Sequence, residues 1–501
     1  MEVTNLIAVD LGASSGRLIS GQFDGKKIKL KEQFRFSNHP VNLNGHLHWD
    51  YLKIFQEIKY GLAIAMKDLA HLTGMNVDTW GVDYGFLTQQ GEVLLTPYSY
   101  RDNRTAAYQK KLAQRIDGAS LFRKTANQPA KINTNLQLFA DNQRYPFLTQ
   151  QAARVLLMPN LISYFFSGVQ ESEFTIASTT GLLNTATRQW DQAVLKRLGL
   201  PRHWFAPVTV GGHISGSVLP EITTELQLNP DMKMISGVGH DTAAALLALP
   251  ITPAQRQQIA FISCGTWSIV GRQTSQPVVS QAAYQAGLTN EGCFDGSNRL
   301  LQNLTGLWII QELQREWSHQ GKMIDFSSMV REAQISGTSQ SYIDPNAEIF
   351  SSPGNMAERI KRFLKVTQQP LPQDRGQLIR IVIESLALSY KMIIEQLGQL
   401  TAQPIKTIHM FGGGIKNQLL VQLTADYTGK QVVTGPTEAS VLGNIVSQLQ
   451  ILGQLTPEAT PGVLDRSFTV KKISPVVTDD LEAKYAAFKQ AIADWRESNG
   501  S

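Results

Sequence analysis

The chain has 501 residues, of which 42% are hydrophobic, and this length predicts two domains of roughly 200 to 250 residues. Its formal net charge of only +5 argues against a nucleic-acid partner, and no apolar stretch approaches the roughly 20 residues that span a bilayer. Cys264 and Cys293 are the only cysteines and lack CxxC spacing, which argues against a disulfide framework and a zinc site and favours a cytoplasmic protein.

The N-terminal segment predicts a strand, a tight turn and a second strand. Leu6 to Val9 are apolar, Asp10 stands where this strand is expected to end, and the residues after it are small. Successive backbone N–H groups in such a turn form a nest for anions, and a carboxylate at a strand end suits hydrated Mg²⁺. No G-x-x-x-x-G-K-[ST] motif is present. The run therefore predicts either a phosphate cradle of another type or an ordinary β-turn.

The rest of the first half predicts a β-β-β-α-β unit. Asp24-Gly25 is a hairpin signal, and a third strand continues through Phe34 to Phe36. A helix is expected from about Asp50, and a further strand near Val77 to Val82, followed by a turn at 89–91. The apolar residues of the helix recur at three- and four-residue steps: Leu52, Phe55, Ile58, Leu62 and Met66.

The second half repeats this order of elements. An apolar run at 259–262 leads into a small-residue turn and a second apolar run, and a helix near 378–397 precedes Thr407 to Gly414. A helix through 419–427 and a strand at 431–434 follow. Two similar halves predict a duplicated α/β fold with a cleft between them. The expected division is an N-terminal domain at 1–247, a second domain at 257–450, and an extension at 451–501 that packs on the second domain.

Three glycine-containing turns follow predicted strands, and they share one plausible purpose. They are residues 10–17, Gly265-Thr266, and the run 412–417. Facing turns from two domains could hold the β- and γ-phosphates of ATP, while glycines without side chains let a flat adenine approach the backbone. Each turn alone is a weak signal, but their order after strands is more specific.

These motifs resemble the FGGY family of carbohydrate kinases, within the actin, hexokinase and Hsp70 ATPase fold group. The resemblance covers nearly the whole chain, from Val9 to Asn444. It implies two ribonuclease-H-like (actin-like ATPase) domains, duplicated, with the active site in the cleft between them. The matching stretches are 9–17, 78–83, 100–104, 239–243, 289–292, 303–308 and 435–444.

The resemblance also implies a role for particular residues, with ATP and Mg²⁺ as cofactors. Asp241 matches the catalytic base, which takes the proton of the acceptor hydroxyl as its oxygen attacks the γ-phosphoryl, and Asp10 would hold Mg²⁺ through water. The ATP contacts would be Ala13, Ser14, Ser15, Gly16, Arg17, Thr266, Gln311 and Gly413. The sugar site would be lined by Gly81, His240, Asp241, Thr242 and Asn303.

The substrate implied by the resemblance is a small-molecule ketose. At Ala13-Ser14-Ser15 and Trp80-Gly-Val-Asp83 the resemblance implies phosphorylation of the 1-hydroxyl of L-rhamnulose in L-rhamnose catabolism. A monomer or homodimer is expected. A kinase of L-fuculose, L-ribulose or xylulose is one alternative, since a pocket discriminates a single methyl by only ~1 to 3 kcal/mol. A non-catalytic ATP- or sugar-binding switch protein is another. Asn160 departs from the family pattern, in which aspartate is common.

Overall fold

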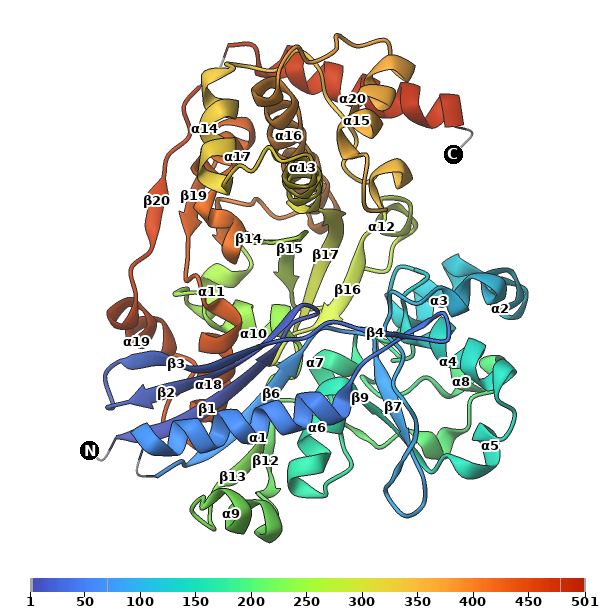
Figure 1. Cartoon of the computed structure of the whole chain (residues 1–501), viewed down its shortest axis with the longest axis vertical. Coiled ribbons are helices and arrows are strands. Elements are labelled where there is room, and N and C mark those ends of the chain that lie inside the picture. Colours follow the sequence, from blue (N-terminus) through green and yellow to red (C-terminus); the bar gives the residue numbers. More distant parts are fainter. Residues whose placement is uncertain (1–2, 70, 478, 500–501) are drawn as a thin grey trace. The chain divides into compact units, whose positions relative to one another are not determined.

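The structure is a computed structural model that describes residues 3–69, 71–477 and 479–499. The chain divides into two compact units, whose elements are labelled in Figure 1. The division at 1–247, 257–450 and 451–501 stays a prediction, and each unit is built from several segments of the chain. The first unit comprises Met1–Pro253, Thr274–Leu300 and Glu438–Phe468, and the second comprises Ala254–Gln273, Leu301–Thr437 and Thr469–Ser501.

The first unit is built on a mixed sheet with the strand order β12-β13-β6-β1-β2-β3 (Figure 1). β1 and β2 are antiparallel, as are β2 and β3, whereas β6 is parallel to β1. Because α1 (Tyr51–Asp68) lies between β3 and β6 in the chain, the predicted β-β-β-α-β unit is confirmed. The strands are β1 (Thr4–Leu11), β2 (Ser15–Phe23), β3 (Ile28–Ser37), β6 (Gly74–Thr79), β12 (His213–Ser217) and β13 (Lys233–Ser236).

Helix α1 covers one face of this sheet, as its periodicity predicts. Asp50 caps the helix by accepting the N–H of Lys53, and Ile58 and Leu62 are fully buried. The same hydrophobic cluster contains Ile7 of β1 and residues of α6 (Met158–Ser167). Leu52 does not belong to the buried stripe, since 64% of its surface is exposed.

The opposite face of the sheet is covered by α18 (Ala439–Ile451), which contacts β1, β2 and β6. Successive side chains of a strand point to opposite faces, so Asp10 points toward α18 while Val9 points toward α1. α18 packs closely on α10 (Asp241–Leu247). A Cβ at Gly443 of α18 would lie 1.7 Å from the carbonyl oxygen of Ala244, so this helix pair needs glycine at the crossing.

A second hydrophobic cluster in the first unit has no counterpart among the predicted elements. It surrounds a small sheet in which β7 pairs with β8 and β9, and Phe86 and Trp204 meet edge to face there. The predicted turn at 89–91 connects β7 to β8. The elements of this cluster include β7 (Tyr84–Leu87), β8 (Val93–Leu95), β9 (Arg154–Leu157), α3 (Gly118–Thr125), α4 (Thr134–Arg144) and α8 (Gln192–Leu198).

The second unit contains neighbouring strands in the order β17-β15-β14-β18-β19-β20 (Figure 1). β14 is antiparallel to β15 and parallel to β18, as the repeated sequence pattern predicts. The strands are β14 (Ile259–Cys264), β15 (Trp267–Thr274), β17 (Asn298–Thr305), β18 (Thr407–Phe411), β19 (Gln431–Thr434) and β20 (Lys471–Ile473). The helices include α13 (Trp308–His319), α14 (Phe326–Ile335), α15 (Met356–Val366), α16 (Arg375–Thr401), α17 (Gln418–Thr428) and α20 (Leu481–Asn499).

One predicted strand is wrong at its end. The strand expected at 77–82 begins at Gly74 and stops at Thr79, because the backbone turns sharply beyond it. Val82 adopts a φ of +71°, a conformation that β-branched residues rarely take. Its N–H donates to the hydroxyl of Thr179 and its carbonyl accepts from the hydroxyl of Thr134, so tertiary contacts hold the strained residue in place.

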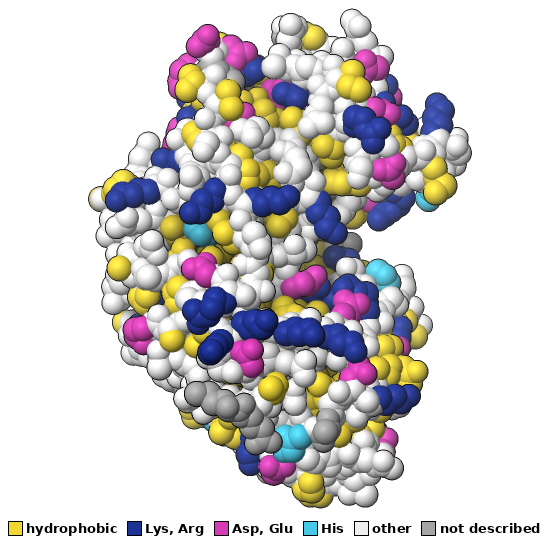
Figure 2. Space-filling view, turned by 90° about the vertical axis from the view of Figure 1, so that its left-hand side faces the viewer, with side chains coloured by type: hydrophobic (Ala, Val, Ile, Leu, Met, Phe, Trp, Pro, Cys, Tyr) yellow, Lys and Arg dark blue, Asp and Glu magenta, His cyan; other side chains and the backbone are white. Residues whose placement is uncertain are grey.

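Acidic and basic side chains are interspersed on the face drawn in Figure 2. Exposed side chains of β3 form ion pairs: Lys31 pairs with Asp68, and Arg35 pairs with Glu32. Among the described residues, no helix combines the length and the hydrophobicity needed to span a membrane.

Candidate active site

The turn after β1 is compact and tied to the end of β3. The N–H of Gly12 donates to the carbonyl of Ser15, and the Asn38 side chain donates to the carbonyl of Gly12. A Cβ at Gly16 would lie 2.2 Å from the Phe36 ring, so a side chain at this position would have to displace that ring. Ala13 and Ser14 lie within this turn, which gives the predicted phosphate cradle a defined backbone.

Arg17 joins the turn to two carboxylates. It lies opposite Asp10 in the β1–β2 register, and its guanidinium forms ion pairs with Asp10 and with Glu438, just before α18. Asp10 is only 5% exposed and also accepts the hydroxyl of Ser440 at 2.8 Å. The structure therefore places the predicted metal residue and a predicted phosphate residue in direct contact.

Asp78 is a neighbour of Asp10 that the sequence analysis did not select. The two residues are paired in the parallel register of β1 and β6. Asp78 is fully buried, and its Oδ2 accepts from the side chain of Asn444 at 2.6 Å, whereas its Oδ1 has no partner among the described residues. Burial and then the charge of Asp10 raise the pKa of Asp78 well above its usual value. The sequence pattern placed this strand at 77–82, with Asp78 near its start, so nothing indicated that Asp78 lies near the strand's end beside Asp10.

α18 holds both of these carboxylates. Ser440 and Asn444 are one turn apart on the helix, and they donate to Asp10 and Asp78 respectively. They are more than 360 residues away from their partners in the chain, so no local pattern could have revealed them.

His240, Asp241 and Thr242 lie together where α10 begins. The Nδ1 atom of His240 caps the helix by accepting the N–H of Thr242 at 3.2 Å, and the hydroxyl of Thr242 donates to Asp241 at 3.0 Å. Burial, followed by the charge of Asp10, raises the pKa of Asp241 to about 7. The side chain keeps 36% of its surface exposed, so it is accessible while partly desolvated. A carboxylate with this pKa suits a general base at neutral pH.

Glu173 fixes the backbone that carries these residues. It is buried at the start of α7 (Phe174–Ala177), and its Oε2 accepts the N–H of Gly239 at 3.1 Å. The hydroxyl of Thr175 accepts the N–H of His240 at 3.1 Å. Burial raises the pKa of Glu173 to about 7. Asn160, the departure noted in the sequence, accepts the backbone N–H of Glu173 at 3.5 Å.

Gly81 lies against the His240 side chain. A Cβ at Gly81 would be 3.2 Å from Nε2 of His240 and 3.1 Å from Cγ2 of Thr179. The missing side chain therefore allows the imidazole and the threonine to approach this segment closely. Glycine at position 81 thus has a packing role in addition to its predicted place in the sugar site.

In the second unit, two of the predicted turns pack against each other around Cys264. A Cβ at Gly412 would lie 2.8 Å from the Cys264 carbonyl oxygen, and one at Gly414 would lie 2.2 Å from its Sγ. A Cβ at Gly413 would meet nothing within 4 Å, so this glycine presents open backbone. Burial raises the pKa of the Cys264 thiol to about 11.

Thr266 and Gln311 belong to this same group. The carbonyl of Thr266 accepts the N–H groups of Gly306 and Trp308, which ties the β14–β15 turn to the start of α13. Gln311 lies in the first turn of that helix and is half-buried. Asn303 is exposed on β17, outside this cluster of hydrogen bonds.

The donor set of the first unit is chemically suited to Mg²⁺. Asp10 and Asp78 supply adjacent carboxylates, and one oxygen of Asp78 is buried without a partner. No group of three or more His, Cys, Asp or Glu side chains within the described ranges is arranged to hold a metal. The two carboxylates of Asp10 and Asp78 fit Mg²⁺, which is usually held by one or two carboxylates together with substrate phosphates and water.

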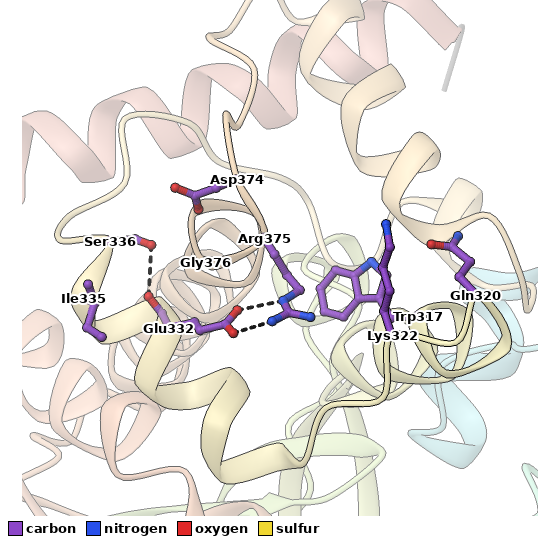
Figure 3. Close-up of a pocket in the computed structure, with 9 residues that line it drawn as sticks. All are labelled: Trp317, Gln320, Lys322, Glu332, Ile335, Ser336, Asp374, Arg375 and Gly376. Carbon is purple, nitrogen blue, oxygen red and sulfur yellow. Dashed lines mark hydrogen bonds and ion pairs between the residues drawn. The ribbon is translucent and has the colours of Figure 1, made fainter.

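Two cavities lie apart from the predicted site residues. A cavity of about 660 Å³ in the first unit is lined partly by Ile214, Phe294 and Ile451. A cavity of about 530 Å³ in the second unit contains the Glu332–Arg375 ion pair, with Arg375 over the ring of Trp317 (Figure 3). Neither cavity includes a residue for which a catalytic or binding role is predicted.

Comparison with known proteins identifies the family. Residues 5–248 match the N-terminal domain and residues 260–450 the C-terminal domain of the FGGY family of carbohydrate kinases. The chain is 34% identical to a rhamnulokinase of Bacteroides thetaiotaomicron and 36% identical to one of Mannheimia succiniciproducens, each over 97% of this chain and 99% of the relative. A xylulose kinase structure from Lactobacillus acidophilus matches with a TM-score of 0.81 at 16% identity, covering 99% of both chains.

The chain belongs to the FGGY family of carbohydrate kinases. It has the two-domain, actin-like ATPase fold of that family, as the sequence predicts. It is a phosphotransferase whose substrates are ATP and a small-molecule sugar.

Proposed function

We propose that this kinase transfers the γ-phosphoryl group of ATP to the 1-hydroxyl of L-rhamnulose, giving L-rhamnulose 1-phosphate and ADP in L-rhamnose catabolism. The observation that carries this proposal is the similarity to two rhamnulokinases along almost the whole chain. The Asp241 carboxylate supports it, because it is partly exposed and burial raises its pKa to about 7, in the range that suits a general base.

In the proposed mechanism, Asp241 takes the proton of the 1-hydroxyl while the oxygen attacks the γ-phosphorus. The bond between that phosphorus and the β–γ bridging oxygen breaks, and ADP leaves with the electron pair. General base catalysis contributes ~10²- to 10⁴-fold, and most of the remaining acceleration comes from in-line positioning and charge neutralisation.

The ATP contacts divide between the two units. Ala13, Ser14, Ser15, Gly16 and Arg17 would contact the phosphates from the first unit. Thr266 would be the second phosphate contact, and Gln311 and Gly413 would lie at the adenosine. Support comes from the open backbone at Gly413 and the N–H groups of the 12–15 turn.

Gly81, His240, Thr242 and Asn303 would bind the sugar together with Asp241. We propose Mg²⁺ as the metal, held by Asp10 through water, and it would neutralise phosphate charge when bound. We also propose the domain division at 1–247, 257–450 and 451–501. The protein would be cytoplasmic, a monomer or homodimer, and without a nucleic-acid or membrane partner.

A panel of ketoses in a coupled ADP-release assay tests the substrate. We expect L-rhamnulose to give the highest kcat/KM, ahead of L-fuculose, L-ribulose and xylulose. The discrimination by the C6 methyl alone is ~1 to 3 kcal/mol, or roughly 10- to 200-fold. A flat profile, or one led by xylulose, would overturn L-rhamnulose while leaving the kinase assignment intact. ADP release without sugar should be low, because closure around substrate excludes water.

A further inference from the structure

Arg299 is a buried arginine beside the proposed sugar site to which no role has yet been given. It lies on the part of β17 that belongs to the first unit, and its side chain is 0% exposed. Its guanidinium donates to the carbonyl of Gly292, forms an ion pair with Glu291, and donates to Nδ1 of His240 at 3.0 Å. A fully buried cation is costly, so its retention here calls for a specific use.

The contact with His240 determines where that imidazole carries its proton. Arginine has five N–H donors and no acceptor, and a backbone N–H can only donate. Nδ1 of His240 receives both the Arg299 guanidinium at 3.0 Å and the N–H of Thr242 at 3.2 Å, whereas the acceptor Oδ1 of Asp241 lies farther away, at 3.5 Å. The two closer donors therefore assign Nδ1 as the unprotonated, accepting nitrogen. The neutral ring then carries its proton on Nε2.

The protonated nitrogen faces the proposed substrate region. Nε2 of His240 lies beside Gly81, and it makes no hydrogen bond to another described residue. An N–H that no protein group accepts is available to donate to a ligand, and the His240 side chain keeps 8% of its surface exposed. A ketose oxygen, whether carbonyl or hydroxyl, can accept from this atom.

We propose that Arg299 is a positioning residue that holds His240 in its neutral, Nε2-protonated form, so that His240 presents a fixed hydrogen-bond donor to an oxygen of the sugar. This inference rests on the proposed function, because it assigns His240 to sugar binding. Burial and the charge of Arg299 lower the pKa of His240 well below its usual value, which agrees with a ring that stays neutral.

The first test reads the tautomer directly and needs no substrate. Protein labelled with ¹⁵N only at histidine is examined by NMR from pH 5 to 8, and a His240→Gln variant assigns the His240 signals. We expect a neutral ring with its proton on Nε2 throughout this range. An Nδ1-protonated ring, or an imidazolium at pH 7, would overturn the proposal whether or not the enzyme prefers L-rhamnulose.

The second test separates positioning from general stability. In Arg299→Met we expect KM for the preferred ketose to rise about threefold to tenfold, the worth of one neutral hydrogen bond, with KM for ATP changed less than twofold. The His240 signals should show a mixture of tautomers. The ketose with the highest kcat/KM in the panel serves as substrate, so the test of Arg299 remains valid even if that ketose is not L-rhamnulose.

Arg272→Met is the matched control. Arg272 is also buried, with 1% exposed surface, but it donates to Thr401 and to the carbonyl of Gln403 in the second unit. We expect this variant to lose thermal stability while its ketose KM and its His240 signals stay unchanged. An Arg299→Met protein with an unaltered ketose KM and a pure Nε2 tautomer would show that Arg299 has only a structural role. Should that variant not fold, the wild-type tautomer decides.

Discussion

The two sheets share one frame but carry different chemistry. From β12 to β3 in the first unit and from β20 to β17 in the second, the strands follow the same spatial order. In the first unit β1 is antiparallel to β2 and parallel to β6, and in the second unit β14 is likewise antiparallel to β15 and parallel to β18. The strand next to these, β13 or β19, is again parallel to its inner neighbour, and the outermost strand, β12 or β20, is antiparallel to it.

The corresponding strand ends hold different residues. Asp10 and Asp78 are paired in register near the ends of β1 and β6, whereas the equivalent pair at β14 and β18 is Ser263 and Phe411. The first unit thus brings two acidic side chains together, and the second presents glycines packed around a buried thiol. The two sheets thus share one topology, whereas the proposed base Asp241 and the Asp10–Asp78 pair belong to the first unit.

The largest expected effect follows from removing the proposed base in the first unit. Asp241→Asn should lower kcat by ~10²- to 10⁴-fold, because the amide cannot take the proton of the sugar hydroxyl. Sugar-dependent ADP release measures this, with a thermal melt to verify folding. Asp231→Asn, an exposed aspartate of the same unit, is the control and should retain activity. Near-normal turnover in a folded Asp241→Asn protein would refute the assignment of the base.

The pH dependence of the same group gives a second, smaller effect. Asp241 must be ionised to act as base, and its pKa is about 7 in the folded protein. We expect kcat/KM to fall up to tenfold for each pH unit below this value and to level off above it. A profile that stays flat from pH 5 to 8 would contradict an ionised Asp241 as the catalytic form.

The parts predicted from sequence are those with a local signal. The β1 turn, α1 with its Asp50 cap and the repeated strand order all arise from periodicity and small-residue turns. The links to α18 and Arg299 could not be predicted, because Asn444, Arg299 and their partners are joined only by tertiary packing. The sequence misplaced the end of β6 because the positive φ of Val82 depends on hydrogen bonds with two distant threonines.

In the second unit, we expect stability to depend on the close packing of the glycine turn against Cys264 rather than on charged side chains. Gly414→Ala should destabilise the protein by ~1 to 3 kcal/mol and weaken ATP binding, because its Cβ would overlap Cys264. Gly413→Ala is the neighbouring control, since its Cβ would meet nothing within 4 Å, and its melting temperature should match the wild type. Equal melting temperatures for the two variants would show that this turn can adjust.

Asp78 allows the acidic pair Asp10–Asp78 to be compared with Ser263 and Phe411, its equivalent in the second unit. Its folded-state pKa is raised, so the buried acid keeps its proton while the unfolded one ionises, and stability falls as pH rises above about 4 toward the folded-state pKa. Asp78→Asn removes this loss. Melting temperatures at pH 5 and pH 8 should therefore show the variant gaining on the wild type as pH rises.

Ser263→Ala, at the equivalent strand end of the second unit, is the control for Asp78→Asn. It should shift the melting temperature equally at both pH values, since it changes no titrating group. Parallel pH curves for Asp78→Asn and the wild type would mean that Asp78 is ionised in the folded state.

The smallest expected effect is at Cys264, a buried thiol next to Ser263 at the end of β14. With a pKa of about 11 and 1% exposed surface, this side chain carries very little thiolate near neutral pH and is shielded from reagents. Treatment of the native enzyme with iodoacetamide at pH 7.5 should leave Cys264 unmodified by mass spectrometry and leave activity unchanged, whereas the urea-unfolded chain should react readily. Rapid labelling of Cys264 in the native protein would show that the glycine turns open in solution, and the contrast between a reactive first unit and a chemically inert second one would fail.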